Sequence, residues 1–99
     1  MKVFVVNYKA EFDCESYNDV YLYDSFEKAY NCFLDIVTEW FNEDQFNTEF
    51  PIDGNSMVWE TEEYDGHFSK SNKYASLFIE ERHNVVNYLN VSVEEQEVL

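Results

Sequence analysis

Acidic side chains around Asp65 and Gly66 are the residues of this chain best suited in type to hold a metal ion. An EF-hand calcium loop needs glycine at its sixth position and acidic groups at its first, third and twelfth. With Gly66 sixth, Thr61 would be first and Asn72 twelfth, so two ligand positions fail. The sequence therefore predicts a solvated acidic turn there and no cofactor. The metal alternative is a casual divalent site made from Glu62, Glu63, Asp65 and His67.

A nucleophilic site would have to be built from Cys14 or Cys32 with His67 or His83. Such a site needs a thiol and an imidazole brought together in space, and no family signature surrounds either cysteine. Carboxylate pairs also fit glycosidase or nuclease chemistry, but only where a concave pocket sets their separation. A small sheet with one helix rarely offers such a pocket. We expect no enzymatic activity, no catalytic residue and two free thiols.

Phosphate binding is disfavoured because the two glycines are isolated and no P-loop lysine follows them. The six basic residues are scattered along the chain: Lys2, Lys9, Lys28, Lys70, Lys73 and Arg82. Nucleic-acid binding requires local positive charge, so direct contact with DNA or RNA is not expected.

Acidity is the most unusual property of the sequence. The chain carries 21 acidic and 6 basic residues, a formal net charge of -15, and residues 29–69 contain no lysine or arginine. Unpaired like charge opposes compaction, so fold stability does not account for it. Solubility is one explanation. Binding to a basic surface is the other.

The composition predicts one folded domain spanning residues 1–99. Disordered acidic chains have few aromatic residues, whereas 19% of this chain is aromatic. The longest wholly apolar run, Val3 to Val6, is too short for a transmembrane helix or a signal-peptide core. These features predict a cytoplasmic protein that does not enter membranes.

The first half of the chain predicts a hairpin followed by a helix. Residues 2–12 alternate as in a strand, 13–18 are turn-like and 19–23 form a second strand. Asp24 or Ser25 can cap a helix over residues 26–42. Its apolar residues recur at the helical period along one stripe: Phe26, Tyr30, Phe33, Val37, Trp40 and Phe41.

The second half predicts three further strands. A loop over 43–56 precedes a strand at 57–64, and Asp65-Gly66 is expected to begin a turn. Strands at 74–82 and 85–93 precede an acidic tail from about residue 94, with a helix over 74–89 as the competing interpretation. The order ββαβββ predicts an α+β fold, a small antiparallel sheet with one helix packed on one face.

Several acids are predicted at intervals close to those of a nucleic-acid backbone. Alternate strand residues lie about 6.6 Å apart and helix residues i and i+4 about 6 Å apart, near the span of two nucleotides. Glu60 and Glu62 would share one side of a strand, and Glu95 and Glu97 could continue another. Asp35 and Glu39 would share the exposed helix face. Tyr21 and Tyr23, near Asp19 and Asp24, are either interface anchors or packing at the sheet edge.

In size, acidity and aromatic content the chain resembles small phage-encoded inhibitors that mimic DNA and block restriction enzymes, CRISPR nucleases or uracil-DNA glycosylase. The resemblance implies a non-enzymatic anti-defence protein acting in the host cytoplasm on a basic nuclease or nucleoprotein. The alternative is a generic interaction module, such as a homodimer, without mimicry. The residues predicted to bind the partner are Asp35, Glu39, Glu60, Glu62, Glu63, Asp65, Tyr21 and Tyr23.

Overall fold

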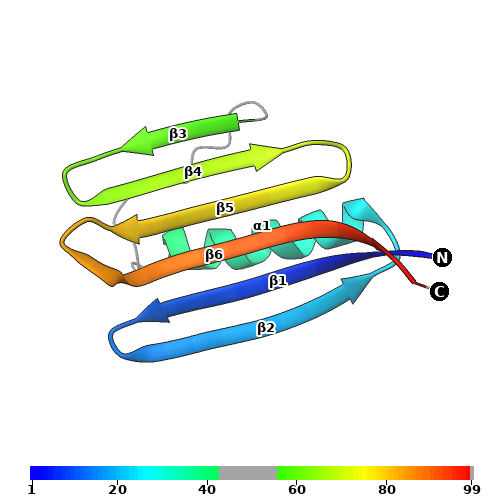
Figure 1. Cartoon of the computed structure of the whole chain (residues 1–99), viewed down its shortest axis with the longest axis horizontal. Helices are drawn as coiled ribbons and strands as arrows, with labels where there is room; N and C mark the ends of the chain where they lie inside the picture. Colours follow the sequence, from blue (N-terminus) through cyan, green and yellow to red (C-terminus); the bar gives the residue numbers. More distant parts are fainter. Residues whose placement is uncertain (43–55, 99) are drawn as a thin grey trace.

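The part of the chain that the structure describes forms one antiparallel sheet with a single helix on one face (Figure 1). The computed structural model describes residues 1–42 and 56–98, so the loop predicted over 43–56 lies almost wholly outside the described residues. The elements are β1 (Lys2–Phe12), β2 (Glu15–Tyr23), α1 (Phe26–Asn42), β3 (Ser56–Glu60), β4 (Tyr64–Lys70), β5 (Tyr74–Glu81) and β6 (Asn84–Glu97). Their order across the sheet is β2-β1-β6-β5-β4-β3. The predicted α+β class, one small antiparallel sheet covered by one helix, is confirmed.

The sheet gains a strand where the sequence predicted a turn at Asp65-Gly66. Thr61 forms the turn instead: its Oγ1 accepts hydrogen bonds from the amides of Glu63 (3.1 Å) and Tyr64 (2.8 Å). A threonine hydroxyl that accepts backbone hydrogen bonds in this way competes with the hydrogen bonds that the same amides could make to a neighbouring strand. Asp65 and Gly66 therefore lie within β4, opposite Glu80 and Ile79 of β5, and the turn prediction for them is wrong.

Helix α1 spans the predicted residues and is capped as expected. The Ser25 Oγ accepts a hydrogen bond from the amide of Lys28 at 3.3 Å, which places Ser25 at the N-cap. The side chain of Lys28 in turn pairs with Asp24 at 2.9 Å. The helix begins at Phe26 because the cap satisfies an amide that otherwise has no intrahelical partner.

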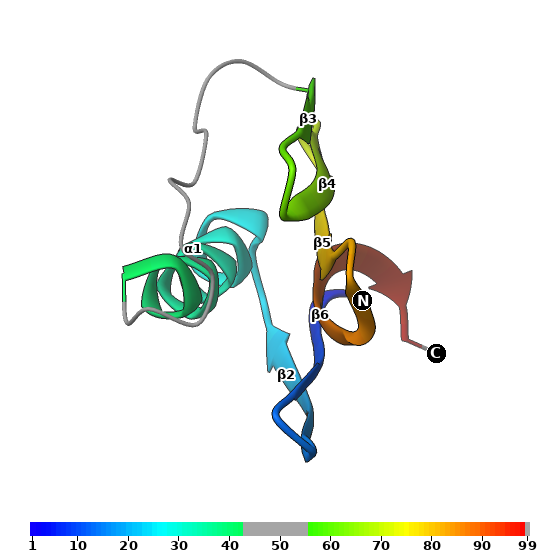
Figure 2. The same cartoon turned by 90° about the vertical axis from the view of Figure 1, so that its left-hand side faces the viewer.

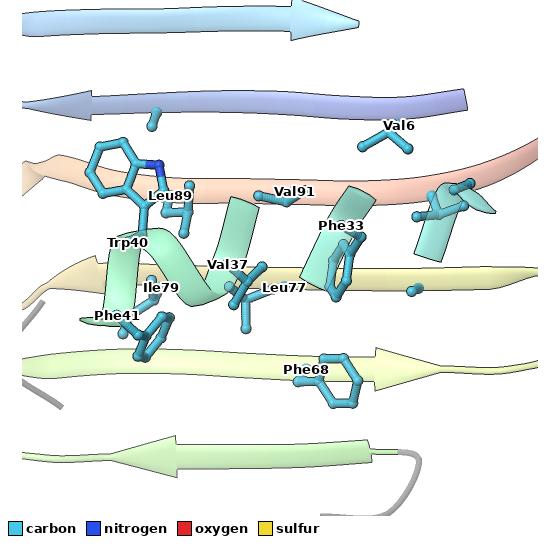
Figure 3. Packing of buried hydrophobic residues seen from close by; sticks show 14 of the residues in the cluster. Val6, Phe33, Val37, Trp40, Phe41, Phe68, Leu77, Ile79, Leu89 and Val91 are labelled. Carbon is cyan, nitrogen blue, oxygen red and sulfur yellow. The ribbon is translucent and has the colours of Figure 1, made fainter. Parts of the chain in front are cut away.

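The core lies between α1 and the sheet, and the other face of the sheet is not covered by α1 (Figure 2). Phe33 and Val37 extend from the helix toward β5 (Figure 3), whereas Trp40 packs against Tyr8 of β1 and donates a hydrogen bond to its hydroxyl. From the sheet, Val6, Leu77, Ile79, Leu89, Val91 and Val93 are fully buried. Leu77 and Ile79 share one face as predicted, and β5 with β6 excludes the helical interpretation of residues 74–89.

The last strand is longer than predicted, because the acidic segment from residue 94 continues β6 to Glu97. Glu95 lies opposite Phe4 and Glu97 opposite Lys2 on β1. Glu95 and Glu97 therefore point to the same face of the sheet, as expected if the two residues continue a strand. The acidic segment is therefore part of the antiparallel pairing between β6 and β1 in the interior of the sheet.

A two-residue turn joins β1 to β2, and both of its residues have positive φ. Phe12 lies opposite Glu15, while Asp13 has φ 51° and Cys14 has φ 69°. Two positive φ angles in a two-residue hairpin define a type I′ turn, which favours Asn, Asp or Gly. The amide of Asp13 donates to Oδ1 of the buried Asn87 at 3.2 Å. Strand β2 consequently begins at Glu15, four residues earlier than predicted.

Replacing Cys14 with glycine should raise the free energy of unfolding by about 0.5–1 kcal/mol, because a side chain in the left-handed region is strained and glycine is not. Urea unfolding under reducing conditions measures this. Cys14→Ala is the control, since it removes the thiol but keeps the β-carbon. Equal stability of the glycine and alanine variants would show that the backbone angle at this position carries no strain.

Candidate interaction surface

The three turns β1–β2, β3–β4 and β5–β6 lie at one end of the sheet, which we call the turn end (Figure 1). Acidic residues concentrate there. Nine acids lie in these turns or within two residues of them: Glu11, Asp13, Glu15, Glu60, Glu62, Glu63, Asp65, Glu80 and Glu81. Arg82 is the only lysine or arginine in the same set of described residues.

The opposite end, called the terminal end, holds the chain termini, the start of α1 and the β4–β5 turn (Figure 1). Four of the six basic residues lie there: Lys2, Lys28, Lys70 and Lys73. Three of them form ion pairs, including Lys2 and Lys73 with the half-buried Glu95. Lys70 lies over the rings of Phe26 and Tyr30, 5.0 Å from the Tyr30 centroid. Among the described residues, the charge imbalance is therefore concentrated at the turn end.

Arg82 partly neutralises two of the predicted partner-binding residues. Its Nη2 lies 2.7 Å from Asp65 Oδ1 and 3.5 Å from Glu60 Oε2, and its Nε donates to Asp65 at 3.0 Å. Glu60 and Asp65 are opposite each other on β3 and β4, so one guanidinium reaches both. Glu62 and Glu63 are exposed and form no ion pair with any described residue.

The uncovered face of the sheet is hollowed beside Arg82. An open depression of about 510 Å³ is lined by Val58, Glu60, Asp65, Gly66, His67, Phe78, Glu80 and Arg82. His67, Phe78 and Tyr88 form a row of rings across β4, β5 and β6, with successive centroids 5.9 and 6.2 Å apart. Three carboxylates line the depression, and Arg82 binds those of Glu60 and Asp65.

The remaining predicted residues form a second group at the other edge of the sheet, the α1–β2 group. Asp35 and Glu39 are exposed on α1, as predicted, and Tyr21 and Tyr23 lie on β2 on the face that α1 covers. A hydrogen bond with Cys32, with a smaller contribution from Asp35, raises the pKa of Tyr23. Partial burial, followed by the nearby charge of Asp19, raises the pKa of Tyr21. Acids and tyrosines are therefore close neighbours along this edge.

The two groups do not form one continuous array. Strands β2 and β3 are the opposite edges of the sheet and are separated by five strand spacings, about 24 Å. Glu60 ends β3 and Glu62 lies in the following turn, so the prediction that they share one side of a strand is wrong. Tyr23 is half-buried against the core, while Tyr21 remains 39% exposed.

Sequence reasoning missed the residues that other segments bring to the turn end. Glu11, Glu15, Glu80 and Glu81 join the β3–β4 acids only because three hairpin turns lie side by side (Figure 1). Arg82 supplies a guanidinium to the region of residues 29–69, which contains no lysine or arginine of its own. The signal that could have found them is their position at strand ends, since acids flank each of the three turns.

No group of three or more His, Cys, Asp or Glu side chains among the described residues could hold a metal ion. Cys14 is exposed and Cys32 half-buried, and both are free thiols. No described helix is both long and apolar enough to cross a membrane.

Stability should fall at alkaline pH because Tyr30 of α1 and Tyr8 of β1 are partly buried against the core. Burial raises the pKa of Tyr30, and burial followed by the charge of Glu39 raises that of Tyr8, although the Trp40 hydrogen bond at 2.6 Å opposes this. A raised pKa favours the neutral phenol in the folded state, so its stabilisation is complete below about pH 10 and is lost as pH rises through the folded value. Urea unfolding across this range measures the decline. Tyr30→Phe should make it shallower, and an unchanged decline would contradict the assignment.

No family model matches the chain, and comparison with curated proteins and with solved structures finds no match.

Proposed function

We propose that this protein is a non-enzymatic inhibitor that binds the basic nucleic-acid-binding surface of a nuclease or nucleoprotein by acidic mimicry of DNA. The observation that supports this is the concentration of nine acids and one arginine at the turn end. A partner surface lined with lysine and arginine is attracted to such an end and is steered toward it during encounter. The proposed setting is the host cytoplasm during phage infection, against a restriction or CRISPR enzyme.

Display on a folded scaffold distinguishes this acidity from a disordered acidic tail. Each of the three turns joins two paired strands, with a register shift between Glu80 and Glu81 in the β5–β6 hairpin, so their carboxylates are held on the sheet before binding. Preorganised charge costs less conformational entropy on association than charge on a mobile segment. Solubility alone would not require nine acids with one arginine at one end while four lysines lie among the acids of the other.

The proposal is tested by displacement of DNA. A fluorescent DNA duplex is bound to a purified restriction enzyme, a guide-loaded CRISPR nuclease or uracil-DNA glycosylase, and the protein is then added. Release of the duplex from at least one of these proteins without its cleavage is expected. Release from none of them, with the protein shown to be folded in the same buffer, would contradict the proposal for these three classes of target.

A homodimerising interaction module without mimicry is the alternative function. The free edge of β2, with its exposed Val20 and Leu22, favours it. Light scattering over a range of protein concentrations distinguishes the two, because only the alternative predicts a mass that doubles as concentration rises. The charge of -15 on each copy opposes that association at low salt.

A further inference from the structure

Strand β2 is a long and unprotected sheet edge. It pairs only with β1, its nine residues contain no Lys, Arg, Pro or Gly, and its register with β1 is continuous from Glu15 to Tyr23. Every residue from Glu15 to Leu22 is exposed. Natural proteins usually protect such an edge with lysine, proline, a bulge or a covering segment, because unpaired backbone groups recruit another strand. Among the described residues, none of these devices is present on β2.

The hairpin geometry determines which backbone groups of β2 are free. The pair Phe12 and Glu15 closes the two-residue turn and is therefore a hydrogen-bonded pair. Because hydrogen-bonding direction alternates along a strand, the amide and carbonyl groups of every second residue point away from β1. These residues are Ser16, Asn18, Val20 and Leu22, and no described residue outside β1 bonds to the backbone of β2.

The two faces beside this edge differ in character. On the uncovered face, Val20 is 58% and Leu22 66% exposed. On the face that carries α1, β2 presents Glu15 and Asp19 with three tyrosines, and Asp35 and Glu39 are exposed on the helix above. Lys9 lies one strand inward, opposite Asn18. An added strand would therefore meet apolar side chains on one face and negative charge on the other.

We propose that the edge of β2 binds an extended segment of a basic partner, which adds a seventh strand to the sheet. Its side chains alternate, with apolar residues beside Val20 and Leu22 and lysine or arginine on the face of Asp19. Backbone hydrogen bonds to the four outward-facing residues supply affinity, and the alternation supplies specificity. This inference rests on the proposed function, because it assigns a docking strand to the same basic partner. A second copy of the chain is disfavoured, since both edges would carry the same acids.

The probe is the peptide Val-Lys-Val-Lys-Val-Lys, and Val-Val-Val-Lys-Lys-Lys is the control with the same composition and charge but no alternation. Backbone amide shifts and hydrogen exchange are followed by nuclear magnetic resonance. The alternating peptide should protect the amides of Ser16, Asn18, Val20 and Leu22, and the control should not. Asn18→Pro removes one outward donor and should weaken binding about tenfold, while Asn18→Thr should retain it.

Val20→Lys provides a second variant that keeps every backbone donor and adds a repulsive charge at the edge; it should also abolish the protection. Equal binding of both peptides, with shifts confined to the turn end, would overturn the docking strand and leave charge mimicry intact. Absence of binding by either peptide would overturn the docking strand too. Shifts of β2 amides that depend on protein concentration alone would assign the edge to a second copy. In the DNA-displacement assay, full activity of Asn18→Pro would show that the partner does not use β2.

Discussion

Replacing Glu60, Glu62 and Glu63 together with glutamine should weaken inhibition of a DNA-binding partner by about 10- to 100-fold. Each exposed charge pair contributes about 0.5–1 kcal/mol, and about 1.4 kcal/mol corresponds to a factor of ten. The three residues surround the β3–β4 turn and are exposed, so the substitution should leave the core unchanged. The DNA-displacement assay measures the loss.

The matched control for this variant is Glu27→Gln with Glu94→Gln and Glu97→Gln. It removes the same three charges from exposed residues at the terminal end. Because it removes the same amount of negative charge, a general effect of net charge would weaken both variants alike. We expect the control to change inhibition by less than about twofold, because charges far from the contact are largely screened by salt. Equal losses in the two variants would show that the position of the acids at the turn end is irrelevant.

Asp35→Asn with Glu39→Gln tests whether the α1–β2 group contributes as well. If the partner spans the helix and β2, this pair should weaken inhibition severalfold, because two exposed charges are removed. If it contacts only the turn end, inhibition should be unchanged. Retention of full inhibition by this variant and by the β3–β4 variant would contradict charge mimicry as a whole.

Phe33→Ala should lower the free energy of unfolding by about 3–5 kcal/mol, a large part of the total stability of a domain of this size. Phe33 is fully buried where α1 meets the sheet, and its ring lies 5.6 Å from Tyr30 and 6.2 Å from Phe68, measured between centroids. Its removal leaves a cavity at the contact that attaches the helix. Urea unfolding followed by tryptophan fluorescence measures the change.

Phe26→Ala is the control for Phe33→Ala, because it is the same substitution at a half-buried position of the same helix stripe. It should cost clearly less, since a partly exposed ring buries less apolar surface. A loss for Phe33→Ala no greater than that for Phe26→Ala would contradict the assignment of Phe33 to the centre of the core.

The local features of the fold could be predicted from the sequence, because they depend on short-range patterns. The period of the apolar residues and the Ser25 cap were enough to place α1 at residues 26–42. The period of two likewise placed β1 and β5 to within one residue. Thr61 shows where such reasoning stops: Asp-Gly is the stronger turn signal in general, but a threonine hydroxyl three residues from Tyr64 formed the turn instead.

The candidate surface was predicted only in part, because it depends on strand order. Acidity could be read from composition, whereas the meeting of Glu11, Glu63 and Glu81 at one end depends on three turns that lie side by side. Arg82 could not have been assigned to Asp65 without the pairing of β4 with β5. The separation of the α1–β2 group from the β3–β4 acids likewise follows from the placement of β2 and β3 at opposite edges.

The most direct test of charge mimicry is the salt dependence of inhibition, measured for the parent protein and for the β3–β4 glutamine variant against a partner that releases DNA. Salt screens a contact between carboxylates and a basic surface. The affinity of the partner for the parent protein should therefore fall steeply as the salt concentration rises. The variant should show a shallower fall, since three of the screened charges are absent. Affinity that does not change with salt, or an identical slope for both proteins, would contradict the proposal that the acidic turn end binds the partner.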